Sequence, residues 1–306
     1  MYAIDEIGPI VYGAGAFNTQ YRDPAIPDPS EVIRYALRKG FRAIDTAAFY
    51  GPSEDIVGKA LSDIEDEFPR DSYFLCTKAG RWETDEFDYS TAAIRKSVTR
   101  SLSRLGTDYV DLLYIHDVEF QTEEQAIEAL TEATALKKEG KVRYIGFSGY
   151  PVKYLVEIAE LARQRGLQID AVLSYCNLTL QCDLLLQYAD KLKAAGVKVV
   201  LNASPLSMSL LRSGRTHEFH PADQGLREAA DKLAKSFASR GVELADVAVQ
   251  YSFANWNGPT VIGLRSQQEI DAVLANSKTN PDPALVDEAL AALSEYHNYN
   301  WPSGKF

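Results

Sequence analysis

The sequence predicts an α/β fold, a single (β/α)8 barrel domain that extends over residues 1–306. Short apolar runs alternate with amphipathic segments from one end of the chain to the other. The runs are almost continuously apolar, which is typical of parallel strands buried on both faces. A doubly wound sheet is the structural alternative. It would need a domain boundary, and no Pro-, Gly- or Ser-rich linker divides the chain.

Eight short segments are expected to form the strands, because each is rich in Val, Ile, Leu, Tyr or Phe. In chain order they are residues 10–15, 41–45, 73–78, 109–116, 142–148, 170–176, 197–204 and 260–264. Eight strand–helix units in one uninterrupted run are the repeat that builds this barrel.

The segments between these strands carry the start and stop signals of helices. Residues 90–106 begin at Ser90 and end at Gly106 after a basic last turn. Residues 122–140 follow the same order, with a threonine cap, acidic residues first and lysines last. The other expected helices are residues 29–39, 152–166, 182–196 and 225–241, together with one that starts at Ser53.

The composition excludes several classes of partner. The formal net charge of −11 would repel nucleic acid and anionic membranes. No apolar run approaches the ~20 residues of a membrane span, and the start "MYAIDEIGPI" lacks the features of a signal peptide. The three cysteines have no metal-type spacing, and Cys76 lies in an apolar run as a core residue would. We therefore expect a cytoplasmic protein with no metal site.

Ionisable side chains stand where three neighbouring strands are expected to end. Asp45 ends the second strand and is followed by Tyr50 on its loop, Lys78 ends the third, and His116 ends the fourth. Singly, each has an ordinary explanation, such as a turn cap for Asp45 or a satisfied core histidine for His116. In a (β/α)8 barrel, however, the active site lies at these strand ends. Four such residues on adjacent strands predict a catalytic site.

Together the four residues could perform acid–base chemistry. The hydroxyl of a tyrosine has an ordinary pKa of ~10, which is too high for a base near neutrality. We expect the Lys78 ammonium to lower the pKa of Tyr50, Asp45 to keep that lysine charged, and His116 to donate a hydrogen bond to the substrate oxygen. Tyr50 could then give or take a proton.

The motifs "AIDTAAFYGPSE", "CTKAGR", "YIHD", "GFSGY" and "NASPLSMSLL" resemble the aldo-keto reductase superfamily over essentially the whole chain. In that family an Asp, a Tyr, a Lys and a His, in this order, are catalytic. The segments "VLSYCNLTLQ", "NASPLSMSLLR" and "HDVEF" are similar to its D-arabinose 1-dehydrogenase and L-galactose dehydrogenase branch. The resemblance implies a nicotinamide cofactor bound across the top of the barrel without a Rossmann fold.

The loops after the seventh and eighth strands are where such barrels usually bind phosphate. Their serines, backbone amides and arginine suit a pyrophosphate, although an ordinary Ser- and Gly-rich loop is the alternative reading. The resemblance adds a carboxamide site, in which a glycine, Gly149, replaces a common asparagine. The expected cofactor-binding residues are Ser148, Asn177, Ser204, Leu206, Ser207, Ser209, Gly263, Leu264, Arg265 and Glu269.

Two departures from the family pattern bear on the cofactor. NADP-using relatives usually carry basic residues at the positions of Gly263 and Glu269, where they hold the 2′-phosphate. Glu269 would repel that phosphate and could accept hydrogen bonds from ribose hydroxyls, which predicts NAD; Arg265 is the residue that could reverse the preference. The usual aromatic ring over the nicotinamide is replaced by Ala203.

The resemblance implies an NAD-dependent aldose 1-dehydrogenase that oxidises D-arabinose, L-fucose or L-galactose to the aldonolactone. Phe49, Trp82 and Asp117 border the expected site and could contact the sugar. One alternative is an NADPH-dependent reductase of pyridoxal or other carbonyls, since the same four residues work in both directions. Another is a cofactor-sensing regulatory subunit, although no N-terminal extension precedes the first strand to serve as a docking segment.

Overall fold

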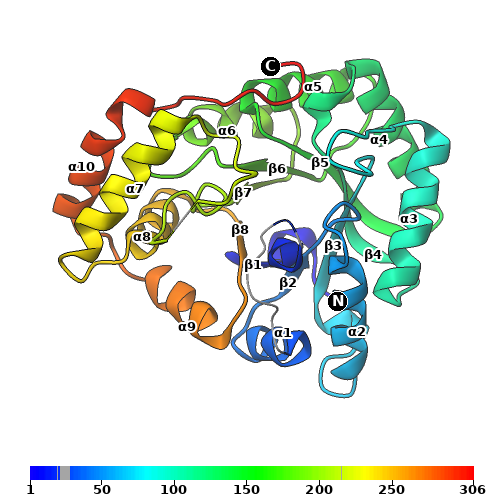
Figure 1. Ribbon diagram of the computed structural model, residues 1–306. Coiled ribbons are helices and arrows are strands. Elements are labelled where there is room, and N and C mark those ends of the chain that lie inside the picture. Colours follow the sequence, from blue (N-terminus) through cyan, green and yellow to red (C-terminus); the bar gives the residue numbers. More distant parts are fainter. Residues whose placement is uncertain (19, 21–27, 215) are drawn as a thin grey trace.

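The computed structural model describes residues 1–18, 20, 28–214 and 216–306, and its strands form a closed parallel barrel (Figure 1). The strands follow one another in chain order, and β8 pairs with β1 to close the barrel. They are β1 (Ile10–Gly13), β2 (Ala43–Asp45), β3 (Phe74–Ala79), β4 (Val110–Ile115), β5 (Val142–Gly149), β6 (Ala171–Tyr175), β7 (Val199–Ala203) and β8 (Thr260–Gly263). The predicted (β/α)8 fold is thus confirmed.

The helices form a ring outside the strands (Figure 1). They are α1 (Pro29–Arg38), α2 (Ser53–Asp63), α3 (Thr91–Leu105), α4 (Glu123–Lys138), α5 (Val152–Gln164), α6 (Leu184–Ala194), α7 (Gln224–Ala238), α8 (Leu244–Asn255), α9 (Gln267–Asn276) and α10 (Pro283–Ala292). The start and stop signals act as expected: Ser90 accepts a hydrogen bond from the Ala93 amide, and Gly106 ends α3 in the left-handed conformation. Among the described residues, no helix is long and apolar enough to cross a membrane.

The expected order of helices is incomplete in the last third of the chain. Two helices, α7 and α8, lie between β7 and β8, and α9 and α10 both follow β8. Of these four helices, only α7 was expected from the sequence. Helix α8 packs against α7, α9 and α10 at once. Because it is covered on several sides, its sequence "LADVAVQYSFAN" lacks the one-sided apolar stripe that identifies a surface helix.

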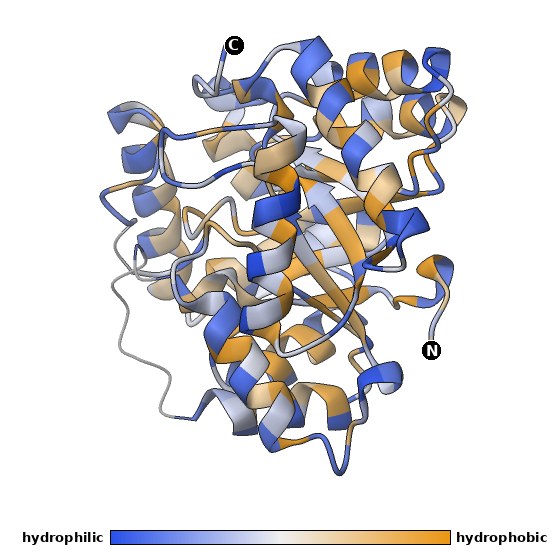
Figure 2. Ribbon diagram, turned by 90° about the vertical axis from the view of Figure 1, so that its right-hand side faces the viewer, coloured by the Kyte–Doolittle hydropathy of each residue, from blue (hydrophilic) through white to orange (hydrophobic). Residues whose placement is uncertain are grey.

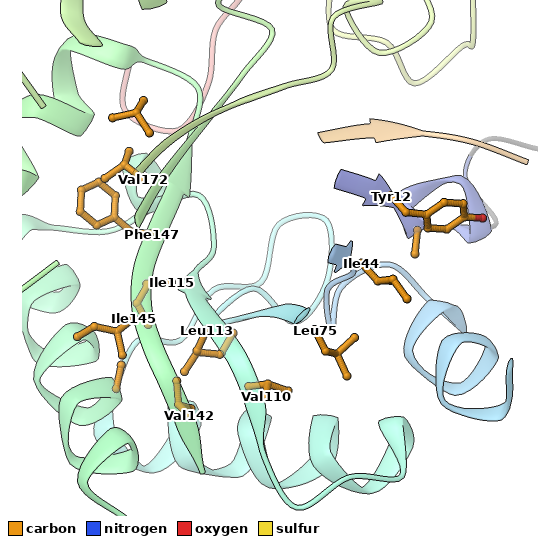
Figure 3. Packing of buried hydrophobic residues seen from close by; sticks show 14 of the residues in the cluster. Tyr12, Ile44, Leu75, Val110, Leu113, Ile115, Val142, Ile145, Phe147 and Val172 are labelled. Carbon is orange, nitrogen blue, oxygen red and sulfur yellow. The ribbon is translucent and has the colours of Figure 1, made fainter. Parts of the chain in front are cut away.

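Strand side chains alternate between two layers of the core. Ala43, Phe74, Cys76, Leu112 and Tyr114 belong to a cluster of strand residues inside the barrel. The residues between them belong to the larger layer that separates the strands from the helices, which is shown in Figure 3 by Ile44, Leu75, Leu113 and Ile115. This alternation of period two determines which polar residues at the strand ends face inward.

The hydropathy of the helices matches this arrangement. In Figure 2 the strands are largely hydrophobic, and the surrounding helices have hydrophobic and hydrophilic sides. At the amino ends of the strands, the short helix η1 (Ile4–Glu6) covers the barrel. Ile4 and Ile7 there pack into the interior cluster. The opposite end therefore carries the accessible space.

Candidate active site

A cavity of about 720 Å³ opens at the carboxyl ends of the strands. Its lining includes residues from the ends of β1, β2, β3, β5, β6, β7 and β8 and from the following loops, and it extends between α8 and α9. The inner end contains all four predicted catalytic residues, Asp45, Tyr50, Lys78 and His116.

Strand alternation brings three of these side chains together. Asp45 lies two residues after the inward Ala43, Lys78 two after Cys76, and His116 two after Tyr114. The Lys78 ammonium pairs with Asp45 Oδ1 and donates a second hydrogen bond, 2.9 Å long, to the Thr46 carbonyl. Both side chains are almost completely buried, so neither could remain charged without this pairing.

Tyr50 reaches the same point from the loop between β2 and α2. The Ser53 hydroxyl contacts the Thr46 hydroxyl at 2.8 Å and donates to the Ala14 carbonyl at 2.9 Å, which holds the loop against β1. The Lys78 ammonium lies 4.9 Å from the centre of the Tyr50 ring, so its charge acts directly on the phenol. The His116 ring meets the Tyr50 ring edge-on, with their centres 5.7 Å apart.

Lys78 stays charged in spite of its burial. Burial alone would lower the pKa of Lys78, but the attraction of Asp45 and Tyr50 outweighs it and raises that pKa. Burial also raises the pKa of Asp45, and the ammonium of Lys78 opposes that rise. The charge on Lys78 is therefore a permanent feature of the cavity floor.

The pKa of Tyr50 differs from the sequence-based expectation. Lys78 does act in the predicted direction, but burial is the larger effect, so the pKa of Tyr50 is raised above its ordinary value. The negative charges of Asp45 and Asp117 add to the rise. In this state Tyr50 keeps its proton, which suits a proton donor directly.

His116 is neutral in this environment. Burial lowers the pKa of its imidazole well below the usual value, and the positive charges of Lys78 and Arg81 act in the same direction. The Tyr89 hydroxyl donates to the His116 carbonyl and holds the backbone. Among the described residues, none is hydrogen-bonded to the buried Nδ1 atom. A neutral imidazole can orient a substrate oxygen without adding a second positive charge.

Most of the predicted cofactor-binding residues lie on the cavity. They are Ser148, Ser204, Leu206, Ser209, Gly263, Leu264, Arg265 and Glu269. The Glu269 carboxylate accepts a hydrogen bond of 2.6 Å from the Arg265 amide, and the Ser266 hydroxyl caps the first turn of α9. The first turn of α9 therefore lies beside the cavity, with its capping positions occupied by Ser266 and Glu269.

Two predicted cofactor residues do not lie on the cavity surface. Asn177 donates to the carbonyls of Tyr150 and Tyr175 and to the Ser174 hydroxyl, so its amide group supports the protein backbone. Ser207 is buried within the loop after β7. Sequence spacing alone could not distinguish these internal contacts from ligand contacts.

The loop after β7 is held in an unusual backbone conformation. Ser204, Ser207, Met208 and Ser209 all have positive φ angles, between 48° and 77°. Such angles are costly for residues with a side chain and are commonly found at binding sites. This loop and the start of α9 line the same cavity as the four catalytic candidates, an arrangement compatible with a nicotinamide dinucleotide that has one end at those residues.

The glycine at position 149 has a local explanation. A Cβ atom there would collide with Glu119 Oε2. Glu119 is buried, accepts a hydrogen bond from the Tyr150 amide at 3.0 Å, and accepts another from the Ser303 hydroxyl at 2.9 Å. An asparagine at position 149 is therefore incompatible with Glu119 in its present position.

The three predicted substrate residues are separated by the structure. Phe49 and Asp117 line the cavity beside His116. Trp82 is not part of that lining; it stacks with Arg100, whose guanidinium carbon lies 4.5 Å from the ring centre. This position does not support a substrate contact for Trp82.

Several cavity residues were not predicted from the sequence. Arg81 follows Lys78 by three positions, and its charge in the segment "CTKAGR" was an available signal. Trp301 comes from the C-terminal segment, which crosses the top of Figure 1 toward α5. It stacks on Tyr150 with ring centres 4.6 Å apart. No local pattern could connect residues that distant in the sequence.

Comparison with known proteins gives a consistent result. A model of the aldo/keto reductase family matches residues 9–293. D-arabinose 1-dehydrogenase of Saccharomyces cerevisiae is 42% identical over 99% of this chain and 96% of that protein. L-galactose dehydrogenase of Arabidopsis thaliana is 34% identical over 98% of this chain and 94% of that protein. The resemblance inferred from the sequence motifs, to this family and to this branch, is confirmed.

A solved structure supports the fold as well. The holo form of an aldo-keto reductase from Bacillus halodurans aligns with a TM-score of 0.71 over 98% of this chain and 96% of that chain. The sequences are 22% identical, so the likeness supports the fold alone.

Proposed function

Because the chain belongs to the aldo/keto reductase family of oxidoreductases, we propose that it is an NAD-dependent aldose 1-dehydrogenase. Its substrate would be D-arabinose, or L-fucose or L-galactose, which share the ring stereochemistry of D-arabinose at C2 to C4. The product would be the aldonolactone. The buried cysteines Cys76, Cys176 and Cys182 are free thiols, which is consistent with work in the reducing cytoplasm.

The observation that carries this proposal is the match to the yeast D-arabinose 1-dehydrogenase over nearly the full length of both chains. The cavity adds physical support. A phenol, an ammonium, a carboxylate and a neutral imidazole line the same cavity as the loop after β7 and the start of α9. These are the groups that a coupled transfer of a proton and a hydride requires.

In the proposed mechanism, the anomeric hydroxyl of the sugar loses its proton to Tyr50. Lys78 stabilises the phenolate that accepts this proton, and Asp45 keeps Lys78 charged and oriented. His116 donates a hydrogen bond to the same sugar oxygen. The loop after β7 and the start of α9 would hold NAD, which would supply the acceptor for the hydride that leaves C1. The cyclic hemiacetal thereby becomes a lactone.

Glu269 supports the choice of NAD over NADP. Its carboxylate lies on the cavity at the start of α9, where a 2′-phosphate would add negative charge beside it. A carboxylate can instead accept hydrogen bonds from the two ribose hydroxyls of NAD.

One observation favours the reverse reaction as a second candidate. Because burial raises the pKa of Tyr50, the ligand-free protein holds a protonated phenol, which is ready to donate to a carbonyl oxygen. An NADPH-dependent aldehyde reductase would use Tyr50 in this way.

The two candidates are separated by one assay. The purified protein is given NAD or NADP with a panel of aldoses, and NADH or NADPH with pyridoxal and simple aldehydes, while nicotinamide absorbance is followed. We expect the highest kcat/KM with NAD and D-arabinose or a stereochemically related aldose. A preference of about tenfold or more for NADPH and aldehydes would overturn the proposal in favour of a reductase. Tight cofactor binding without turnover of any substrate would favour a regulatory subunit.

A further inference from the structure

Arg81 is a charged residue built into the wall of the cavity. Its guanidinium carbon lies 3.9 Å from the centre of the Phe49 ring and 5.0 Å from that of Phe87. The terminal nitrogens donate to Asp117 Oδ2 at 2.6 Å and to the Thr84 carbonyl at 2.8 Å. The side chain is therefore fixed in place while it lines the cavity.

Asp117 connects Arg81 to the catalytic end. It follows His116 in the sequence, and its Oδ2 atom lies 3.6 Å from His116 Nε2. Its side chain is only 4% exposed, and its backbone has a left-handed φ of 57°. Within the described part of the chain, no residue donates a hydrogen bond to its other oxygen, Oδ1. An ion pair beside the reacting centre thus retains unused hydrogen-bonding capacity.

We propose that the Arg81–Asp117 pair binds the hydroxyl groups of an uncharged sugar next to the reacting carbon, and so determines the substrate class. The inference rests on the proposed function. Each sugar hydroxyl both donates and accepts. Asp117 Oδ1 can accept from one hydroxyl while an unused Arg81 N–H group donates to that hydroxyl or to its neighbour. The hydroxyl at C2 is closest to the anomeric carbon, and it is the one we assign to the pair.

The mutual neutralisation of Arg81 and Asp117 argues against negatively charged substrates for this pair. Arg81 and Asp117 neutralise each other, so the pair offers no net positive charge to a sugar phosphate or a sugar acid. Phe49 and Phe120 line the same space and supply apolar surface for the C–H groups of the ring. A simple aldehyde lacks the hydroxyls and would leave the buried polar groups without partners, which a site of this kind rejects strongly.

The test compares D-arabinose with 2-deoxy-D-ribose, which is D-arabinose without its 2-hydroxyl. For the native protein, Arg81→Met and Asp117→Asn, we would measure kcat and KM for both sugars and the Kd of NAD from fluorescence quenching. Arg81→Lys keeps the positive charge and is the second variant if Arg81→Met does not fold. Arg240→Met is the matched control, because Arg240 also stacks on an aromatic ring and pairs with a carboxylate, but it lies in the turn after α7, outside the cavity.

We expect kcat/KM of the native protein to be about tenfold or more higher for D-arabinose than for 2-deoxy-D-ribose. This is the usual effect of losing one hydrogen bond to a charged group. In Arg81→Met and Asp117→Asn, that preference should shrink to about threefold or less, mainly through a higher KM for D-arabinose. The Kd of NAD should stay unchanged, and Arg240→Met should behave like the native protein.

Two results would overturn the inference while leaving the proposed function intact. In one, the variants keep the native preference for the 2-hydroxyl. In the other, they lose activity on both sugars equally, which indicates a structural role for the pair. If the native protein turns over neither sugar but reduces aldehydes, the proposed function itself fails, and the sugar-binding role fails with it.

Discussion

The Tyr50 hydroxyl is subject to two opposing influences. Lys78 stabilises its phenolate through its positive charge, whereas burial and the nearby carboxylates of Asp45 and Asp117 stabilise the protonated form. Burial is the larger effect, so the pKa of Tyr50 is raised in the ligand-free protein. If Tyr50 accepts the proton in the proposed oxidation, the reaction should become faster as the pH rises, because a larger fraction of Tyr50 is then deprotonated.

Replacing Tyr50 with phenylalanine tests this role. The variant loses the hydroxyl but keeps the ring that packs against His116. We expect kcat to fall by about 10²- to 10⁴-fold, the usual contribution of a positioned acid or base. The Kd of NAD should be nearly unchanged in a fluorescence titration. The residual rate should also lose the rise with pH, and full turnover by the variant would contradict the assignment.

At the level of elements, strands and helices contribute differently to the site. The strands place Asp45, Lys78 and His116 through their alternation, so these positions follow from strand register. Helix α9 contributes through its first turn, where Glu269 contacts the Arg265 amide beside the cavity. The cofactor end thus depends on one helix N-terminus and its preceding loop.

Glu269→Gln tests whether this helix selects NAD. Removing the negative charge should reduce repulsion of a 2′-phosphate and weaken the contact with free ribose hydroxyls. We expect the ratio of kcat/KM for NAD to that for NADP to fall by about tenfold. Asp271→Asn is the control, because Asp271 lies on the same helix but pairs with Lys39 outside the cavity. An unchanged ratio in Glu269→Gln would show that another residue selects the cofactor.

At the scale of the whole molecule, the C-terminal segment connects distant parts of the chain. Trp301 packs on Tyr150 and His220, and the Ser303 hydroxyl donates to the buried carboxyl group of Glu119, which follows β4. Burial raises the pKa of Glu119 to about 8, and the charge of Asp117 adds to the rise. The folded protein thus favours a protonated Glu119 at neutral pH.

This raised pKa predicts a loss of stability with increasing pH. Between the ordinary pKa of a glutamate, ~4.3, and about 8, the folded state holds a proton that the unfolded state has released. The free energy of unfolding should therefore fall by up to about 1.4 kcal/mol for each pH unit in this range from this group alone. Glu119→Gln cannot ionise and should remove this component.

Urea unfolding at several pH values between 5.5 and 8.5 would measure the effect. Glu160→Gln, an exposed position on α5, serves as the control and should keep the native pH dependence. Identical pH profiles for the native protein and Glu119→Gln would contradict the raised pKa. The same urea unfolding curves also test the prediction of a single domain over residues 1–306. One cooperative transition would agree with that prediction.

Local patterns in the sequence predicted most of the fold and the four side chains that converge at one end of the cavity. Continuous apolar runs identified all eight strands, and polar residues at three of their ends identified Asp45, Lys78 and His116. These predictions succeeded because the alternation of side chains with period two is visible within a short segment. The carboxyl ends of barrel strands, where active sites lie, can therefore be located from the same segments. Helix α8 escaped detection because its apolar residues contact several neighbours.

What the sequence determined by itself is therefore the barrel, the order of its strands and the identity of the four converging side chains. Only the tertiary structure decided that burial outweighs Lys78 at Tyr50, that Asn177 and Trp82 point to other partners, and that Arg81, Asp117 and Trp301 share one cavity. The reason is physical. Desolvation and hydrogen-bond partners depend on every group packed around a side chain, and those groups come from segments far apart in the chain.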